Sequence, residues 1–255
     1  MGLEIFKLNG RVAWVTGGSK GLGFQMAEAL ASVGADIIIN SRHAAEAAAA
    51  AGAIAAKYGV RTWSAAADVT SEDQIAAFVE RAMAELGAID ILVNNAGINI
   101  RQSTTEMSLA DWRQVLDVNL TGPFVCSKAV IPAMRARGWG RIIHLSSILG
   151  HVGLAGRPPY TASKGGLILL TKTQALELAT TGVTVNAICP GPFATEMNRP
   201  LLDDPEKYAA FVAKIPLGRW GELTEIDGAV IYLASPASSF VTGTTLLVDG
   251  GWTAQ

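Results

Sequence analysis

Short, continuous apolar segments alternate with longer helical patterns along almost the whole chain. A strand that is apolar without interruption is buried on both faces, which is typical of a parallel sheet covered by helices. Because crossovers between parallel strands are right-handed, the alternation predicts a doubly wound α/β fold with seven parallel strands. We expect strands at residues 11–16, 35–40, 61–66, 89–94, 141–145, 183–188 and 244–248. We expect helices near residues 22–33, 44–57, 72–86, 109–136, 161–180 and 224–234.

Composition narrows the class of protein. No linker, charge block or repeat divides the 255 residues, which predicts a single domain over residues 1–255. Half of the residues are apolar and only 16% are charged, which indicates a well-filled core and further burial between subunits. The net charge of −2 and the lack of a basic run argue against binding to nucleic acid or anionic membranes. No uncharged apolar run reaches ~18 residues, and no signal peptide is evident, so we expect a cytoplasmic protein.

The two cysteines point to a reducing compartment. Cys126 and Cys189 lie in apolar segments without histidines at ligand spacing. Two buried thiols are therefore favoured over a disulfide, and we expect no metal site.

A glycine-rich turn follows the first predicted strand. Residues 16–23 read T-G-G-S-K-G-L-G, and a helical pattern begins at once. Glycines allow a tight turn and let backbone N–H groups approach a pyrophosphate at the helix N-terminus. The spacing is G-x-x-x-G-x-G and not the G-x-G-x-x-G fingerprint, so a simple turn is the alternative. Its place after the first strand of an α/β chain favours a phosphate cradle.

The end of the second strand bears on the choice of cofactor. In a dinucleotide fold this strand faces the adenosine ribose, where NAD-binding proteins carry an acid. Here the strand runs into Ser41 and Arg42 without an acid, and Lys20 lies in the glycine turn. These two cations are placed to hold a 2′-phosphate, which favours NADP(H) over NAD(H). Two solvated surface cations are the alternative.

Polar residues also end the third and fourth strands. Asp68 is placed to accept a hydrogen bond from an adenine amino group, although Thr70 or Ser71 beside it would also serve as a helix N-cap. The fourth strand ends in Asn94-Asn95-Ala96-Gly97, which suits close approach of a ligand to the backbone or a plain turn.

Asn119 and Gly122 interrupt the apolar pattern of the helix predicted at 109–136. A polar residue and a glycine both cost stability inside a helix. We therefore expect that function requires a backbone group at this point.

A tyrosine and a lysine occupy one face of the helix predicted at 161–180. Tyr160 and Lys164 are four residues apart, and Ser147 lies in the loop after the fifth strand. One positive charge about 4 Å from a phenol, at an effective dielectric of ~20, is worth roughly 4 kcal/mol. That energy lowers the pKa of the phenol by up to about three units, towards neutral pH. A solvated helix face is the alternative for an isolated Y-x-x-x-K.

In this order and at these spacings, the motifs resemble those of the short-chain dehydrogenases/reductases over essentially the whole chain. The matching motifs are T-G-x-x-x-G-x-G at 16–23, Asp68, Asn94–Gly97, Asn119, Ser147, Tyr160 with Lys164, and Pro190-Gly191 with Thr195. The resemblance implies a Rossmann-type sheet and hydride transfer between NADP(H) and a carbonyl or secondary alcohol.

The resemblance also implies roles for single residues. Ser147 would bind the substrate oxygen and Tyr160 would exchange a proton with it. Lys164 would lower the pKa of the tyrosine and bind the nicotinamide ribose. Asn119 would anchor a water through its main chain, and Thr195 would hold the nicotinamide carboxamide. The residues expected at the cofactor are Gly17, Ser19, Lys20, Gly21, Leu22, Gly23, Ser41, Arg42, Asp68, Val69, Asn95, Ala96, Gly97, Tyr160, Lys164, Pro190, Gly191 and Thr195.

The substrate is less constrained. Residues 192–216 are polar and proline-punctuated and predict a substrate lid, with a surface helix pair as the alternative. Arg101, His151 and Arg157 would give the pocket a positive mouth that suits a carboxylate, or they are solvated loop residues. Further motifs resemble the branch with gluconate 5-dehydrogenases, which favours a sugar acid or polyol. The 3-oxoacyl-carrier-protein reductases are the alternative, although no basic docking surface for an acidic carrier is evident.

A dinucleotide-binding regulator without catalysis is a hypothesis from another class. Such a protein should have lost the tyrosine or the lysine, and both are present. The family resemblance further implies a homotetramer paired through the two long helices and the C-terminal strand.

Overall fold

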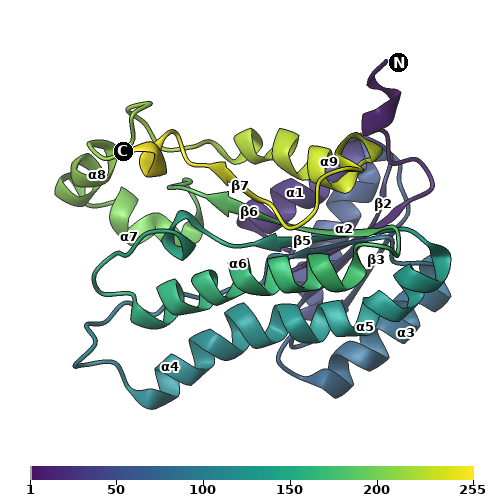
Figure 1. Ribbon diagram of the computed structural model, residues 1–255, viewed down its shortest axis with the longest axis horizontal. Coiled ribbons are helices and arrows are strands. Elements are labelled where there is room, and N and C mark those ends of the chain that lie inside the picture. Colours follow the sequence, from purple (N-terminus) through teal and green to yellow (C-terminus); the bar gives the residue numbers. More distant parts are fainter. Residues whose placement is uncertain (1) are drawn as a thin grey trace.

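The computed structural model describes residues 2–255, and within them seven parallel strands form one sheet (Figure 1). The strand order is β3-β2-β1-β4-β5-β6-β7. Each predicted strand is confirmed, with bounds that shift by at most two residues. The strands are β1 (Val12–Thr16), β2 (Asp36–Ser41), β3 (Thr62–Ala66), β4 (Ile91–Asn94), β5 (Gly140–Leu145), β6 (Val183–Pro190) and β7 (Thr245–Val248).

Helices cover both faces of this sheet, as the apolar strands predict (Figure 1). Helices α1, α2 and α9 pack on one face, and α3, α5 and α6 on the other. The helices are α1 (Gly21–Ser32), α2 (Ala44–Tyr58), α3 (Glu72–Leu86), α4 (Leu109–Leu116), α5 (Gly122–Arg137), α6 (Pro158–Leu178), α7 (Arg199–Leu202), α8 (Pro205–Val212) and α9 (Asp227–Ala234). The doubly wound fold is thereby confirmed.

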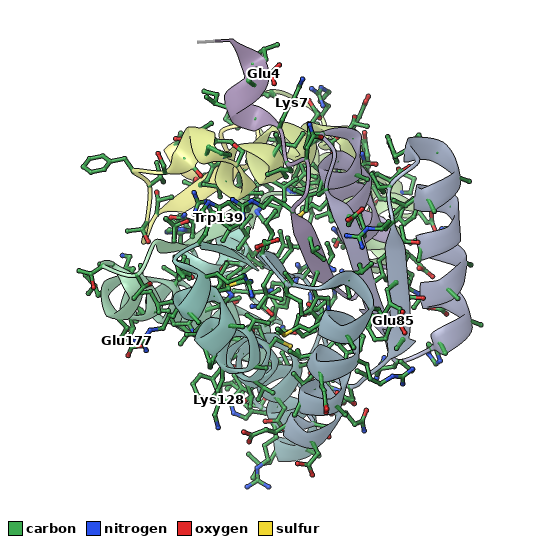
Figure 2. All side chains as sticks on the ribbon, turned by 90° about the vertical axis from the view of Figure 1, so that its right-hand side faces the viewer. Glu4, Lys7, Glu85, Lys128, Trp139 and Glu177 are labelled. Carbon is green, nitrogen blue, oxygen red and sulfur yellow. The ribbon has the colours of Figure 1, made fainter. Side chains whose placement is uncertain are left out.

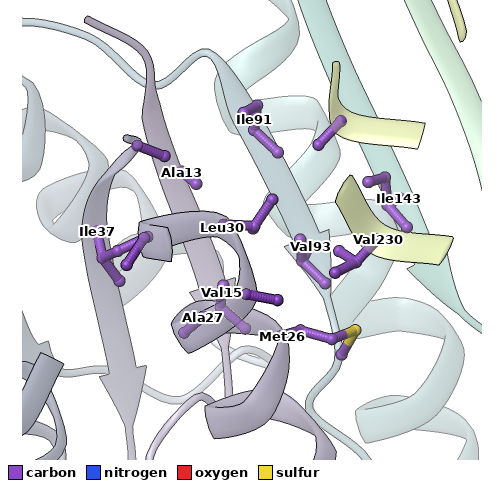
Figure 3. Close-up of a cluster of buried hydrophobic side chains, with 14 of the residues drawn as sticks. Ala13, Val15, Met26, Ala27, Leu30, Ile37, Ile91, Val93, Ile143 and Val230 are labelled. Atoms are coloured by element: carbon purple, nitrogen blue, oxygen red, sulfur yellow. The ribbon is translucent and has the colours of Figure 1, made fainter. Parts of the chain in front are cut away.

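Strand β1 shows how one segment contributes to two cores. Its side chains alternate between the faces of the sheet. Ala13 and Val15 pack against α1 and α9, in the cluster drawn in Figure 3, whereas Val12 and Trp14 pack against the helices of the other face. All of these side chains are buried. Charged side chains such as Glu85 and Lys128, labelled in Figure 2, are exposed.

The connections of β1 create the crevice in which ligands bind in such folds. The chain leaves β1 to pair β2 on one side, and later returns to pair β4 on its other side. Helices that follow these two strands therefore diverge to opposite faces of the sheet. A crevice opens beyond the carboxyl ends of β1 and β4, which is where open α/β sheets bind ligands.

The long helix predicted at 109–136 is interrupted. A π-helical turn, Asp117–Thr121, separates α4 from α5, and Asn119 is fully buried within it. The Asn119 side chain accepts a hydrogen bond from Ile98 N (2.8 Å) and donates one to Ile98 O (2.9 Å). The side-chain amide of Asn119 thus pins the loop after β4, in addition to any role of its backbone. Such π-turns frequently occur at functional sites.

Gly122 has a packing explanation instead of the functional one that the sequence suggested. A Cβ at this position would lie 2.8 Å from Cγ2 of Val69. The glycine lets the start of α5 approach the loop after β3.

Residues 192–216 contain a pair of short helices, as the alternative to a plain lid predicted for this segment. A short 3-10 turn, Glu196–Asn198, leads into α7 and α8, which lie beyond the carboxyl ends of the strands (Figure 1). The segment has a small apolar cluster of its own, formed by Leu201, Ile215 and Trp220 with Phe211 and Trp252 packed against it.

Among residues 2–255, no helix is both long enough and apolar enough to cross a membrane.

Cys126 and Cys189 are buried, and neither is in a disulfide.

Candidate active site

A cavity of about 390 Å³ runs along the carboxyl ends of the strands. Every residue that the sequence analysis assigned to the cofactor lines it, although their contact with a cofactor stays a prediction. Both Tyr160 and Lys164 lie at this cavity, as does Ser147. The cofactor set found there is Gly17, Ser19, Lys20, Gly21, Leu22, Gly23, Ser41, Arg42, Asp68, Val69, Asn95, Ala96, Gly97, Tyr160, Lys164, Pro190, Gly191 and Thr195.

The glycine turn forms one wall of the cavity, and its glycines are required by geometry. Gly17 and Gly21 have φ angles of 60° and 58°, which side chains other than glycine rarely adopt. A Cβ on Gly23 would lie 2.3 Å from Asn95 Nδ2 and 2.6 Å from Gly17 O. Helix α1 begins at Gly21, so its first backbone N–H groups face the cavity at a helix N-terminus, which favours an anion.

The end of β4 braces this turn. Asn95 Nδ2 donates hydrogen bonds to Thr16 O (2.9 Å) and to Gly17 O (3.1 Å). The Thr16 hydroxyl accepts hydrogen bonds from the backbone N–H groups of Asn95 (2.9 Å) and Ala96 (3.0 Å). The N-N-A-G motif therefore holds the glycine turn in place, and its small residues line the cavity.

Two cations lie at the end of the cavity formed by the glycine turn and β2. Arg42 and Lys20 are both exposed, and both line the cavity. Lys20 Nζ lies 3.2 Å from the Glu196 carboxylate, a partner that the sequence did not suggest. A second acid, Glu46, lines the same end and accepts a long hydrogen bond (3.5 Å) from the Ser19 hydroxyl. The sequence analysis did not name Glu46 as a cavity residue. Its position in the first turn of α2 could have indicated that it lies there.

The sequence left open whether the residues after β3 contact adenine or cap the next helix. Asp68 lines the cavity, and its carboxylate accepts hydrogen bonds from the backbone N–H (2.9 Å) and the hydroxyl (2.8 Å) of Thr70. Ser71 is the N-cap of α3, and its hydroxyl accepts from Gln74 N. The capping alternative therefore belongs to Ser71.

Helix α6 begins at Pro158, earlier than predicted, and carries both Tyr160 and Lys164. The buried Lys164 Nζ donates a hydrogen bond of 2.6 Å to Leu145 O at the end of β5 and lies 5.6 Å from the centre of the Tyr160 ring. The Ser146 hydroxyl donates to Lys164 O (2.9 Å), which fastens the helix to the same strand end. The Ser147 side chain hydrogen-bonds Tyr160.

The expected depression of the phenol pKa by lysine is wrong for this structure. Burial raises the pKa of Tyr160, while the hydrogen bond from Ser147 and the positive charges of Arg157 and Arg101 act in the opposite direction. Burial also lowers the pKa of Lys164 to about 8. The sequence argument placed the ammonium at the phenol oxygen and left burial out, whereas Lys164 is held by the Leu145 carbonyl. Burial, and not the charge of Lys164, therefore sets the direction of the shift in the Tyr160 pKa.

Two of the three predicted substrate residues lie close enough to Tyr160 for their charges to act on it. The charges of Arg101 and Arg157 act on its phenol, and burial lowers the pKa of both guanidinium groups. Arg101 donates a hydrogen bond to Asn198 Oδ1 (3.3 Å), and the Arg157 guanidinium lies 5.8 Å from the centre of the Phe211 ring. None of Arg101, His151 and Arg157 is among the described residues that line the cavity, and His151 is exposed.

The cavity also contains residues that the sequence did not suggest, and most of them flank predicted ones. Glu196 and Asn198, for example, follow Thr195 on the same short turn. The additional lining residues are Asn40, His43, Glu46, Ala67, Ile98, Val118, Leu145, Ser146, Phe193, Glu196 and Asn198.

Comparisons with known proteins agree with this geometry. A family model described as enoyl-(acyl carrier protein) reductase matches residues 17–253. The gluconate 5-dehydrogenase of Gluconobacter oxydans is 39% identical over 250 residues, which are 98% of this chain and 97% of the relative. The 3-oxoacyl-acyl-carrier-protein reductase of Aquifex aeolicus is 41% identical over 246 residues, 96% of this chain and 98% of the relative.

Among solved structures, a gluconate 5-dehydrogenase from Burkholderia cenocepacia J2315, in complex with NADP and tartrate, superimposes with a TM-score of 0.96. It is 41% identical, and the match covers 99% of each chain.

Proposed function

This chain belongs to the short-chain dehydrogenase/reductase family, and we propose that it is an NADP(H)-dependent oxidoreductase that interconverts a keto group and a secondary alcohol of a sugar acid. The prediction of an enzyme, and not of a regulator, is confirmed by the family. The observation that carries the substrate proposal is the pair of half-buried guanidinium groups, Arg101 and Arg157, whose positive charges act on Tyr160.

The residues of the cavity fit a dinucleotide phosphate. A glycine turn at the N-terminus of α1, open to the cavity, suits a pyrophosphate, and Arg42 with Lys20 suits the 2′-phosphate. The structural relatives crystallised with NADP support the same cofactor. Bound NADP(H) supplies or accepts the hydride at the nicotinamide.

The proton is handled by the chain itself. The Ser147 hydroxyl hydrogen-bonds Tyr160, so it can redirect its single proton to a reacting oxygen that binds beside the phenol. Tyr160 donates its phenolic proton to that oxygen during reduction, and in oxidation its phenolate form accepts the proton of the alcohol. Lys164 donates a hydrogen bond to Leu145 O at the end of β5 and adds positive charge near the phenol. Asn119 fixes the loop that carries Ile98 by accepting a hydrogen bond from Ile98 N.

The region next to Tyr160 suits a substrate with a carboxylate and several hydroxyl groups. Two guanidinium groups in partial burial favour a carboxylate. The side-chain oxygens of Asn99, Gln102 and Thr161 are buried and have no hydrogen-bond partner among the described residues. Buried polar atoms are normally paired, so these oxygens are candidates to accept from substrate hydroxyls or from bound water.

The 3-oxoacyl-acyl-carrier-protein reductases remain the second candidate, because relatives of this type are as similar as the gluconate enzymes. Purified protein should be assayed for NADPH oxidation with keto sugar acids and with β-keto thioesters. We expect kcat/KM to be higher for the keto sugar acids. A clear preference for the thioesters would contradict the sugar-acid proposal while leaving the reaction class intact.

We expect Arg157→Met to reduce kcat/KM for a keto sugar acid by about 10- to 100-fold, because a hydrogen bond to a charged group is worth about 1.5–3 kcal/mol. Methionine keeps much of the apolar stem that packs near Phe211. The matched control is a neutral ketone, for which the variant should lose less than about threefold. An equal loss for charged and neutral substrates would contradict a carboxylate contact.

Three finer features belong to the same proposal. Residues 192–216 act as a substrate lid within one domain that spans residues 1–255, supported by their position next to the cavity.

A homotetramer is supported by exposed apolar side chains on α6 and β7, among them Leu169, Leu176 and Leu247. Two unpaired buried cysteines support a cytoplasmic location. Gel filtration tests the tetramer.

A further inference from the structure

The short turn Glu196–Asn198 contacts two segments that are distant in the sequence, the glycine turn and the loop after β4. Glu196 contacts Lys20 of the glycine turn, and Asn198 accepts a hydrogen bond from Arg101 of the loop after β4. Asn198 also donates to Phe193 O (3.1 Å), which fixes the turn at its base. This part of the lid segment thus contacts Lys20, which is assigned to the cofactor, and Arg101, which is assigned to the substrate.

The contact between Lys20 and Glu196 uses the cation that is assigned to the cofactor. Lys20 Nζ and Glu196 Oε2 are 3.2 Å apart, and the two side chains are 65% and 68% exposed. Both residues line the cavity, so the carboxylate lies at the place where a phosphate would meet Lys20. A carboxylate and a phosphate repel each other and compete for the same ammonium group.

The ion pair is weak enough to be displaced. Exposed pairs contribute little in water, because both charges stay solvated. A 2′-phosphate that also contacts Arg42 carries more charge than one carboxylate, and it is therefore the stronger partner for Lys20. Displacement nevertheless removes a favourable interaction, and the loss lowers the apparent affinity for the phosphate.

We propose that Glu196 is a specificity-determining residue for the cofactor, because its carboxylate competes with the 2′-phosphate for Lys20. The competition weakens binding of NADP(H) relative to NAD(H) and links phosphate binding to release of the lid segment from the glycine turn. This inference rests on the proposed function, since it requires a cofactor with a 2′-phosphate.

The test compares Glu196→Gln with the wild type by isothermal titration calorimetry. The ligands are NADPH and 2′,5′-ADP, which carry the 2′-phosphate, and NADH and 5′-AMP, which lack it. We expect Kd for the first two ligands to fall about two- to fivefold, as an exposed ion pair allows, and Kd for the other two to stay unchanged. Glu206→Gln is the matched control, because Glu206 is an exposed acid of α8 that does not line the cavity.

Lys20→Met, alone and combined with Glu196→Gln, separates competition from a general effect of charge. We expect the gain from Glu196→Gln to disappear when Lys20 is absent. A gain that persists without Lys20, an equal gain for NADH or for Glu206→Gln, or no gain at all would overturn the inference while the oxidoreductase proposal stands. A wild-type protein that binds neither NADPH nor 2′,5′-ADP would instead overturn the proposed function.

Discussion

Tyr160→Phe is expected to lower kcat for NADPH-dependent carbonyl reduction by about 10²- to 10⁴-fold, the contribution of a positioned proton donor. The substitution removes one oxygen from a ring that is packed beside Ser147 and Lys164, and it leaves the glycine turn untouched. Kd for NADPH should therefore change by less than about threefold. Stopped-flow absorbance with a keto sugar acid, together with calorimetry for NADPH, measures both quantities.

Tyr232→Phe is the matched control for this experiment. Tyr232 lies on α9 and is not among the residues that line the cavity, so deletion of its hydroxyl should leave kcat unchanged. If Tyr160→Phe retained more than a tenth of the wild-type kcat, the phenol would not be the proton-transfer group.

Gly23→Ala is expected to weaken NADPH binding by about 5- to 150-fold. The added Cβ would lie 2.3 Å from Asn95 Nδ2 and 2.6 Å from Gly17 O, so the brace from Asn95 and the backbone of the turn must both shift. Overpacking of this kind costs about 1–3 kcal/mol, and about 1.4 kcal/mol corresponds to tenfold in Kd. Calorimetric titration with NADPH gives the affinity, and thermal unfolding gives the accompanying loss of stability.

Gly52→Ala provides the contrast, because a Cβ at Gly52 meets nothing within 4 Å in the interior of α2. Alanine should raise the free energy of unfolding there by about 0.5–1 kcal/mol and leave Kd for NADPH unchanged. Unaltered NADPH affinity in Gly23→Ala would show that the glycine turn does not form the phosphate cradle.

The strands and the glycine turn were predictable from the sequence because their causes are local. A continuous apolar segment such as Ile91–Asn94 has to be buried on both faces, and only one class of sheet allows that. Gly17 and Gly21 adopt positive φ angles in the turn that leads into α1, and a glycine-rich turn at this place follows from the order of the residues. The spacing of Tyr160 and Lys164 likewise fixes their common helix face.

What the sequence missed depends on contacts between distant segments. The pKa of Tyr160 is set by burial and by arginines from two loops, and neither can be read from a spacing of four residues. The pairing of Lys20 with Glu196 joins segments far apart in the chain. Glu46 reaches the cavity only because α2 presents that side of its first turn. Helices α7 and α8 were only an alternative for residues 192–216, because they are short and their apolar residues show no clear helical period.

The transfer of a labelled hydride tests the central claim most directly. The purified protein is incubated with a keto sugar acid and NADPH that carries deuterium at the transferred position of the nicotinamide, and the alcohol is analysed by mass spectrometry. We predict that the product gains deuterium at the new carbinol carbon, and that Tyr160→Phe slows its formation by about 10²- to 10⁴-fold. Consumption of NADPH without deuterium in the alcohol, or no reduction of any keto sugar acid, would contradict the proposed function.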